Sequence, residues 1–205
     1  MAAEDMKKKD EEKLSFEQSV MLYLHDLIHL LAIIMIVFVL LFRIVIVSGS
    51  SMYSTLWNGD WLLVSGSVFY KEPQHGDIIV ASKESFNSGE PIIKRVIATE
   101  GQTVDIDFTQ GIVYVDGVVL EEEYTYTPTN VEEGVVFPIT IAEDCIFVMG
   151  DNRNGSRDSR DPSIGMIDKR EILGKALFLL FPGTGERNNS APRDFHRIGA
   201  LNHGR

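Results

Sequence analysis

The chain has 205 residues, and its 30 acidic residues outnumber the 19 lysines and arginines, which gives a net charge of −11. This surplus argues against nucleic-acid binding, because contact with a phosphate backbone requires clustered cations. The single cysteine excludes an internal disulfide and a multi-cysteine metal site, and the five histidines are scattered. The sequence therefore predicts one domain, or one domain with a subdomain, that holds no metal and no other cofactor.

The amino-terminal region predicts a membrane anchor. Residues 1–20 form a charged tail that contains the run EDMKKKDEEK, and residues 27–42 read LIHLLAIIMIVFVLLF. Sixteen helical residues cover only ~24 Å of a hydrocarbon core that is ~30 Å thick. Continuing through RIVIV supplies the missing length, because the Arg43 side chain can extend to the interface. We therefore expect residues 21–47 to form a single transmembrane helix.

Two other interpretations of this apolar segment are a buried helix of a soluble domain and a cleaved secretory signal. Few soluble helices are apolar on every face for four turns. A cleavable signal requires small residues at its exit, whereas the bulky run LLFRIVIV follows here. Both observations favour the anchor.

The cations on either side of the anchor predict its orientation, because positive residues stay in the cytoplasm. Four lysines precede the span, all within residues 7–13, whereas Arg43 is followed by no further cation before Lys71. We therefore expect a single-pass protein of the plasma membrane with a cytoplasmic amino terminus. The acidic remainder then lies outside the cytoplasm.

Residues 48–183 predict an all-β domain of the barrel or sandwich type. Short β-rich runs alternate with turn signals, and IVYVDGVVL predicts a tight hairpin at Asp116-Gly117. Residues 101–144 are expected to form a smaller β insertion, and the polar residues 184–205 a frayed tail. No long helix is expected after Phe42, because no run of ten or more residues there has a helical period. The β-rich runs are RIVIV, DWLLVSGSVF, DIIVAS, PIIKRVIA, TVDIDF, GIVYVDGVVL, CIFVMG and KALFLLF.

The loop SGSSMYSTL at residues 48–56 directly follows the anchor and contains Ser51. Its small residues let another backbone approach closely. A serine beside free backbone N–H groups can act as a nucleophile with an adjacent oxyanion hole. Taken alone, the loop also fits an ordinary linker between anchor and domain.

Lys94 lies in the run PIIKRVIA, where a strand places it on one face with Ile92 and Val96 and places Arg95 on the other. Desolvation between β-branched neighbours lowers the pKa of an ammonium group. The resulting neutral amine can deprotonate a serine, as in Ser-Lys variants of acyl-transfer catalysis. The alternative is an edge-strand lysine that faces solvent.

The run GDNRNGSRDSRD at residues 150–161 contains three arginines and three aspartates. Such density predicts a network of charge-assisted hydrogen bonds at the end of a strand. By itself the run is compatible with a metal loop, a structural network or a support for catalysis.

Taken together, these stretches resemble the bacterial type I signal peptidases of peptidase family S26, which are membrane-anchored Ser-Lys proteases. The resemblance runs from the anchor to about Pro182 and rests on SMYSTL, HGDIIV, KRVI and above all GDNRNGSRDSR. It implies a signal-peptidase-like β domain that cleaves signal peptides from exported preproteins after small residues of the Ala-x-Ala type. The lysine of KRVI marks the bacterial type, because the related archaeal and endoplasmic-reticulum enzymes carry histidine there.

The resemblance also implies catalytic roles for individual residues. Ser51 is the expected nucleophile, Lys94 the general base and Ser156 the residue that orients the Lys94 amine. The backbone N–H of Ser51 is one expected oxyanion donor. Some relatives supply a second donor from a serine hydroxyl at the position of Gly49, so a backbone or water donor is expected to replace it in this chain.

Supporting and substrate-binding residues follow from the same resemblance. Asp158 and Arg160 are expected to form an ion pair whose role is to hold the geometry of the site, with Arg95 held by the same loop.

The sequence departs from the family pattern in two turns: Ser54 replaces the usual proline, and ATEGQ at residues 98–102 replaces Gly-x-Pro-Gly. The expected walls of two shallow apolar substrate pockets are Met52, Leu56, Ile92 and Ile93, and Trp57 and Trp61 are candidates either for the membrane interface or for the core.

Two rival functions remain at this level. A repressor-type Ser-Lys autoprotease would be cytosolic and joined to a DNA-binding region, which the apolar span and the acidic charge disfavour. A non-catalytic, membrane-tethered β module that binds a partner would not need Ser51 or Lys94. The favoured interpretation predicts signal-peptide-bearing preproteins and the lipid bilayer as partners, with the protein export machinery nearby.

Overall fold

The structure is a computed structural model that describes residues 16–184 and 192–201. The chain divides into two compact units, Met1–Leu40 and Leu41–Arg205. Helix α2 (Phe16–Leu41) contains a stretch of 24 residues, Gln18–Leu41, with a mean hydropathy of 2.5. A helix of this length spans ~36 Å, which is enough to cross a bilayer. It is the one helix of the described residues with this length and apolarity.

The helix ends at Leu41, before the boundary at residue 47 that the sequence predicted for the anchor. Residues 42–46 instead form β1 (Phe42–Ile46), which pairs antiparallel with β2 (Trp61–Gly66) from Phe42↔Ser65 to Ile46↔Trp61. The β-branched residues of this stretch favour a strand when a partner strand is present. The missing helical length comes from the amino-terminal end, where α2 begins within the expected charged tail; the rest of that tail lies outside the described residues.

The second unit is built mainly from an eight-stranded sheet in the order β1-β2-β11-β3-β4-β9-β10, with β12 paired to β11. No pairing between β1 and β10 closes this sheet in the described part of the chain, so the expected all-β fold is confirmed without a closed barrel. The only helices after Leu41 in residues 42–184 and 192–201 are four 3-10 turns of three residues each. The remaining strands of the sheet are β3 (Ile78–Ser82), β4 (Pro91–Thr99), β9 (Cys145–Met149), β10 (Ile167–Asp168), β11 (Ile172–Phe181) and β12 (Gly199–Ala200), and the 3-10 turns are η1 (Asn87–Gly89), η2 (Arg153–Gly155), η3 (Lys169–Glu171) and η4 (Phe195–Arg197).

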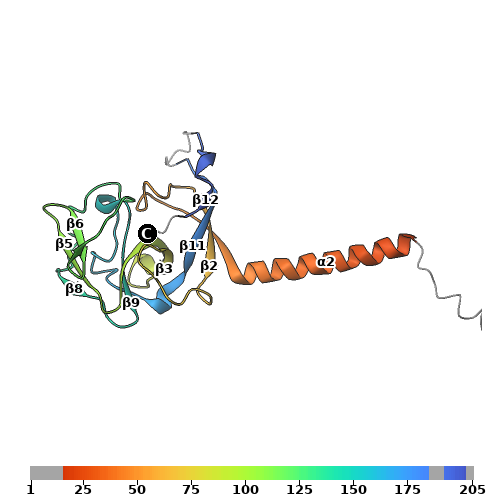
Figure 1. Cartoon of the computed structure of the whole chain (residues 1–205), viewed down its shortest axis with the longest axis horizontal. Coiled ribbons are helices and arrows are strands. Elements are labelled where there is room, and N and C mark those ends of the chain that lie inside the picture. The colour runs from red at the N-terminus through yellow and green to blue at the C-terminus, as the bar shows by residue number, and fades with distance from the viewer. Residues whose placement is uncertain (1–15, 185–191, 202–205) are drawn as a thin grey trace, which may run out of the picture. The chain divides into compact units, whose positions relative to one another are not determined.

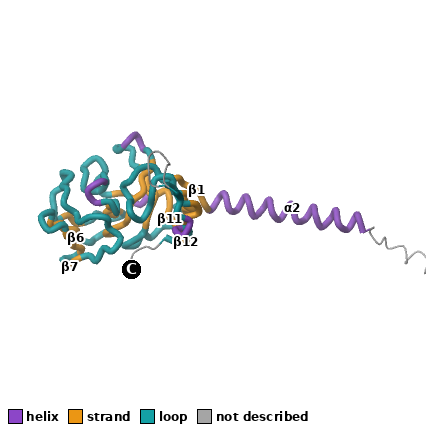
Figure 2. The backbone as a smooth tube through the Cα atoms, turned by 90° about the horizontal axis from the view of Figure 1, so that it is seen from above, coloured by secondary structure: helices purple, strands orange, loops and turns teal. Residues whose placement is uncertain are grey.

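A smaller sheet lies within the expected insertion and has the order β7-β6-β5-β8. Asp116 and Gly117 join β6 to β7 with φ values of 52° and 77°, which the tight hairpin requires. Figures 1 and 2 show this sheet at the opposite end of the β unit from β11 and β12. Its strands are β5 (Thr103–Asp107), β6 (Ile112–Val115), β7 (Val118–Val119) and β8 (Ile139–Thr140).

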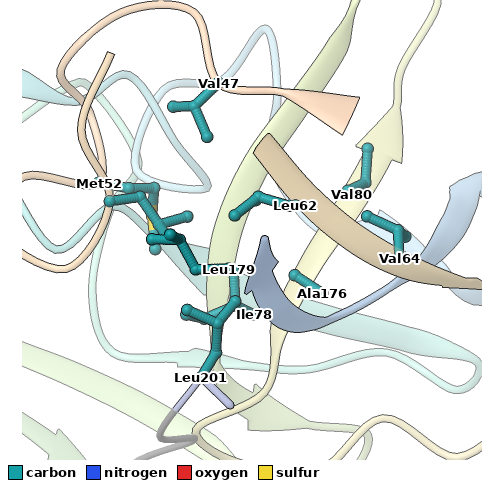
Figure 3. Close-up of a cluster of buried hydrophobic side chains, with 10 residues drawn as sticks. Val47, Met52, Leu62, Val64, Ile78, Val80, Ala176, Leu179 and Leu201 are labelled. Atoms are coloured by element: carbon teal, nitrogen blue, oxygen red, sulfur yellow. The ribbon is translucent and has the colours of Figure 1, made fainter. Parts of the chain in front are cut away.

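A cluster of buried hydrophobic side chains connects the large sheet to the serine loop (Figure 3). It joins Leu62 of β2, Ile78 of β3 and Leu179 of β11 to Met52, the residue that follows Ser51. Burial of Met52 therefore anchors the loop that carries the expected nucleophile to the core of the β unit.

The carboxyl-terminal segment folds back onto the sheet, contrary to the frayed tail expected over residues 184–205. The described residues 192–201 form η4 and β12, and Leu201 is buried in the same hydrophobic cluster as Met52. Arg197 forms an ion pair of 2.7 Å with the buried Asp60. Residues 185–191 and 202–205 of the expected tail lie outside the described residues.

Candidate active site

The structure brings Ser51 and Lys94 together. Ser51 lies in the turn between β1 and β2, and Lys94 lies in β4, where it pairs with Ile79 of β3. The Lys94 Nζ atom is 2.9 Å from Ser51 Oγ and 3.1 Å from the carbonyl oxygen of Ile93. This distance lies within the range in which a base accepts a proton from a nucleophile.

The surroundings of Lys94 favour its neutral form. The side chain is 4% exposed, and burial lowers its pKa from 10.5 to about 8. The negative charges of Asp158, Glu133 and Asp151 oppose this effect, because they favour the ammonium form. With a pKa of about 8, about one Lys94 amine in ten is neutral at pH 7.

The loop after β9 docks directly on the serine turn. Asn152 donates a backbone N–H to the carbonyl oxygen of Ser51 at 3.0 Å and its side-chain amide to that of Ser50 at 3.1 Å. Gly150 makes this approach possible, because an added Cβ would lie 2.4 Å from the Ser51 carbonyl oxygen and 2.2 Å from Ser156 Oγ. The expected close approach of another backbone to this turn is therefore present.

Ser156 lies at the site, but its hydroxyl is not bonded to the Lys94 amine. The hydrogen bond of Ser156 Oγ is a long one of 3.5 Å to the Arg157 carbonyl oxygen. Among the described residues, the amine bonds to Ser51 and to the Ile93 carbonyl instead. The orienting role of Ser156 therefore stays a prediction.

Asp158 and Arg160 form an ion pair that is fully buried. Arg160 Nε and Nη2 donate to the two Asp158 oxygens at 2.8 and 2.9 Å, and Gly150 N–H donates to Asp158 at 3.0 Å. A further Arg160 donor binds the Arg153 carbonyl oxygen at 2.6 Å. Removing one partner would leave an uncompensated charge in the interior, so the pair fixes one conformation of the loop.

Arg95 is held by the same loop through Asp151, a charge of the dense motif to which the sequence assigned no partner. Its Nε and Nη2 donate to the two carboxylate oxygens of Asp151 at 2.8 and 2.7 Å. The Thr55 hydroxyl donates to the same carboxylate at 2.5 Å. Since Arg95 adjoins Lys94 and Asp151 adjoins Asn152, this buried pair fixes β4 relative to the serine turn.

Glu122 is the ion-pair partner of Arg153, and the sequence did not single it out. The buried side chain of Arg153 forms an ion pair with it and donates to the Thr129 hydroxyl at 2.8 Å. Asp151 and Arg153 were recognisable as charges of one dense motif, whereas Glu122 and Thr129 lie in a stretch with no such signal.

A groove of about 430 Å³ opens beside Ser51 and Lys94, and we name it the Ser51 groove. Met52, Ile92 and Ile93 line it as expected, whereas Leu56 is fully buried in the hydrophobic cluster and is not part of the wall. The Leu56 N–H bonds to the Met52 carbonyl oxygen at 2.8 Å, and its side chain packs in the same buried cluster as Met52. The groove is lined by Val45, Ile46, Val47, Ser48, Ser51, Met52, Asn87, Glu90, Pro91, Ile92, Ile93 and Lys94.

Two uncovered strand edges border the Ser51 groove. β4 pairs with β3 from Pro91 onward but gains β9 as a second neighbour only at Arg95. β1 pairs with β2 and forms the end of the large sheet. Within the described residues, both segments therefore present one edge to which an extended peptide can add as a strand.

Backbone groups next to Ser51 provide part of an oxyanion site. The Ser51 N–H has no acceptor among the described residues, so it remains available to a ligand. Gly49 has a φ of 97° and donates its N–H to Asn58 Oδ1 at 3.0 Å, so this group is already engaged. A second donor must come from another group.

The two tryptophans lie at the surface of the β unit rather than in its core. Trp57 is half-buried and stacks beneath the guanidinium of Arg197 at 4.1 Å. Trp61 is exposed and contacts Phe181 edge to face. No cluster of three or more metal-ligating side chains occurs in residues 16–184 and 192–201.

Comparison with known proteins identifies the family. A family model described as signal peptidase, peptidase S26, matches residues 20–181. The probable signal peptidase I-1 of Synechocystis sp. (strain ATCC 27184 / PCC 6803 / Kazusa) is 40% identical over 145 residues, which cover 67% of this chain and 70% of the relative. Signal peptidase I of Bacillus amyloliquefaciens is 35% identical over 152 residues, which cover 69% and 75%.

Among solved structures, a signal peptidase I from Enterococcus faecalis V583 matches with a TM-score of 0.42 and 30% identity, over 51% of this chain and 97% of that one. The family assignment depends on the sequence matches, and the family model covers the serine turn, β4 and the loop after β9. The chain belongs to the signal peptidase family, peptidase S26.

Proposed function

We propose that Ser51 and Lys94 form the catalytic dyad with which this signal peptidase cleaves signal peptides from exported preproteins. The observation that carries the proposal is the 2.9 Å contact between a serine hydroxyl and a buried lysine amine. Family membership supplies the reaction class, a serine endopeptidase reaction on signal peptides. The roles of the individual residues are the proposal.

In the first step, neutral Lys94 Nζ accepts the proton of Ser51 Oγ as the oxygen attacks the scissile carbonyl. The Ser51 N–H stabilises the resulting oxyanion. The protonated amine then gives its proton to the leaving nitrogen, which breaks the C–N bond and leaves an acyl-enzyme. A water molecule, deprotonated by Lys94, attacks the ester and regenerates the Ser51 hydroxyl.

The Ser51 groove is proposed to hold the signal-peptide side of the substrate as an extended strand between β1 and β4. Met52, Ile92 and Ile93 supply apolar walls for small residues at the first and third positions before the scissile bond. Excluding a methylene discriminates by only ~1–3 kcal/mol per site. The position of the active site relative to its substrates must therefore add to the specificity of cleavage.

Membrane attachment through α2 supplies that location, because it raises the effective concentration of substrates that are themselves held in the membrane. The lysines of residues 7–13 support a cytoplasmic amino terminus and a β unit outside the cytoplasm. In this orientation, preproteins reach the site as they leave the export machinery.

The dyad is tested by cleavage of a preprotein with an Ala-x-Ala site by the purified full chain. Ser51→Ala and Lys94→Met are each expected to lower kcat/KM by at least ~1,000-fold, because residues that act as one catalytic unit lose nearly all activity singly. Matched controls are Ser54→Ala and Lys71→Met, which alter an exposed serine of the same turn and an exposed lysine. Full activity in either dyad variant would refute the proposal.

A further inference from the structure

A second groove, of about 320 Å³, lies on the small sheet and shares no residue with the Ser51 groove. We name it the Tyr126 groove. It forms where the long connection between β7 and β8, residues 120–138, folds back over β6. Its lining consists of Gln110, Gly111, Ile112, Val113, Val119, Leu120, Glu122, Thr125, Tyr126, Thr127 and Pro128.

The wall of the Tyr126 groove is held in place by its own hydrogen bonds. Thr129 donates its N–H to the Gly111 carbonyl oxygen at 3.0 Å, and Asn130 donates its side-chain amide to the Phe108 carbonyl oxygen at 2.9 Å. Gly111 has a φ of 74°, and an added Cβ would lie 2.5 Å from Pro128 Cβ. The connection therefore sits directly against the sheet, and its own backbone contacts define the wall of the groove.

The Tyr126 end of this groove adjoins the nucleophile. Tyr126 donates its N–H to the Asp151 carbonyl oxygen at 3.0 Å, and the next residue, Asn152, donates its N–H to Ser51 at the same distance. One peptide unit thus separates the Tyr126 backbone from that of Ser51. The exposed Tyr126 ring also contacts the ring of Tyr53, two residues after Ser51, edge to face at 4.8 Å.

We propose that the Tyr126 groove binds the mature part of the preprotein, the five or six residues that follow the scissile bond. The inference rests on the proposed function, in which the signal-peptide side occupies the Ser51 groove. A substrate that passes Ser51 in an extended form must leave on another side. The small sheet lies at the end of the β unit away from β11 and β12 (Figure 1), so the two grooves lead away from Ser51 over different sheets.

The chemistry of the Tyr126 groove suits a segment of variable sequence. Its one carboxylate, on Glu122, is already paired with Arg153, so the lining favours neither acidic nor basic side chains in a bound peptide. The Tyr126 ring, 57% exposed, offers an apolar face to any side chain or peptide plane. Six extended residues span ~20 Å, and the single peptide unit between the Tyr126 and Ser51 backbones places the near end of the groove within that reach.

The test compares two peptides that share one signal-peptide side and carry either two or eight residues after the scissile bond. The full chain is expected to have a higher kcat/KM for the longer peptide. Tyr126→Ala should reduce the ratio of the two kcat/KM values by about three- to tenfold, which is the size of an aromatic contact. Tyr126→Phe should keep the ratio, because the ring contact with Tyr53 remains and no hydrogen bond of the Tyr126 hydroxyl occurs among the described residues.

Val136→Ala is the control for the connection itself, since Val136 lies in the same segment, is 84% exposed and does not line the groove. A wild-type ratio near one, or a Tyr126→Ala variant that slows both peptides equally, would overturn this inference alone. Failure of the wild-type chain to cleave either peptide would overturn the proposed function and this inference with it.

Discussion

At the scale of single residues, the state of Lys94 is set by two opposing effects. Burial in the interior disfavours the ammonium ion, whereas the carboxylates of Asp158, Glu133 and Asp151 favour it. Burial is the larger effect, and the pKa falls to about 8 rather than further. The same carboxylates that hold the loop after β9 together therefore raise the pH at which the Lys94 amine becomes neutral.

The activity should accordingly rise with pH. We expect kcat/KM to fall about tenfold per pH unit below the Lys94 pKa of about 8 and to level off above it. Glu133→Gln removes a charge that raises this pKa, so its profile should shift to lower pH. The exposed neighbour Glu132 provides the control, Glu132→Gln. Initial rates from pH 6 to 10 measure both profiles, and a flat wild-type profile would contradict the assignment.

Lys94 also shows which site residues a sequence can reveal. The contact between Ser51 and Lys94 was predictable because each lies in a recognisable motif, and charge density identified the loop of Asp158, whereas the catalytic roles of these residues stay a proposal. The inward turn of Leu56 was not predictable, since an apolar residue beside a site can line it or pack beneath it. Glu122 was missed because only the folded chain brings it next to Arg153.

At the scale of elements, the carboxyl-terminal segment holds the turn that follows Ser51, the proposed nucleophile. Arg197 of η4 donates to both Asp60 oxygens at 3.0 and 2.7 Å and to the Thr55 carbonyl oxygen at 3.1 Å. Asp60 also accepts the N–H groups of Trp57 and Gly183 at 2.7 and 2.6 Å. Four donors from three segments thus converge on one buried carboxylate.

Arg197→Ala should therefore destabilise the β unit. Losing one partner of a buried pair typically costs about 3–5 kcal/mol, and because Asp60 keeps two N–H donors we expect about 2 kcal/mol. Thermal unfolding of the full chain in detergent measures the change. Arg170→Ala is the control, because Arg170 forms its ion pair at the surface and is 90% exposed. Equal melting temperatures for the two variants would contradict a structural role for the segment.

The elements that the sequence predicted are those with a local signal. Each expected β-rich run contributes to a strand, and the Asp116-Gly117 turn is where the pattern placed it. The two-residue strands β8, β10 and β12 were not expected, because so short a strand has no periodicity of its own and forms only beside its partner. The anchor boundary was placed too late because β-branched residues suit both a membrane helix and a strand, and pairing with β2 decides between them.

At the scale of the whole molecule, the order of elements along the chain fits the proposed reaction. Strand β1 begins at Phe42, immediately after the apolar helix, and leads into the serine turn at Ser51. A preprotein is likewise an apolar membrane segment followed by its cleavage site. An apolar segment thus precedes the proposed reacting residues of this chain, as it precedes the cleavage site of a preprotein, which favours an encounter at one membrane surface.

This arrangement works only if the β unit lies on the side where cleavage sites emerge, which the lysines of residues 7–13 predict to be outside the cytoplasm. Protease added to intact spheroplasts should therefore destroy a carboxyl-terminal tag and spare an amino-terminal one, and permeabilised cells should lose both. Replacing those four lysines with glutamine should increase the inverted fraction, because it removes the excess of cations on the amino-terminal side of α2 and leaves Arg43 on the other side. A carboxyl-terminal tag that survives in intact spheroplasts would place the dyad in the cytoplasm, on the wrong side of the membrane for exported preproteins.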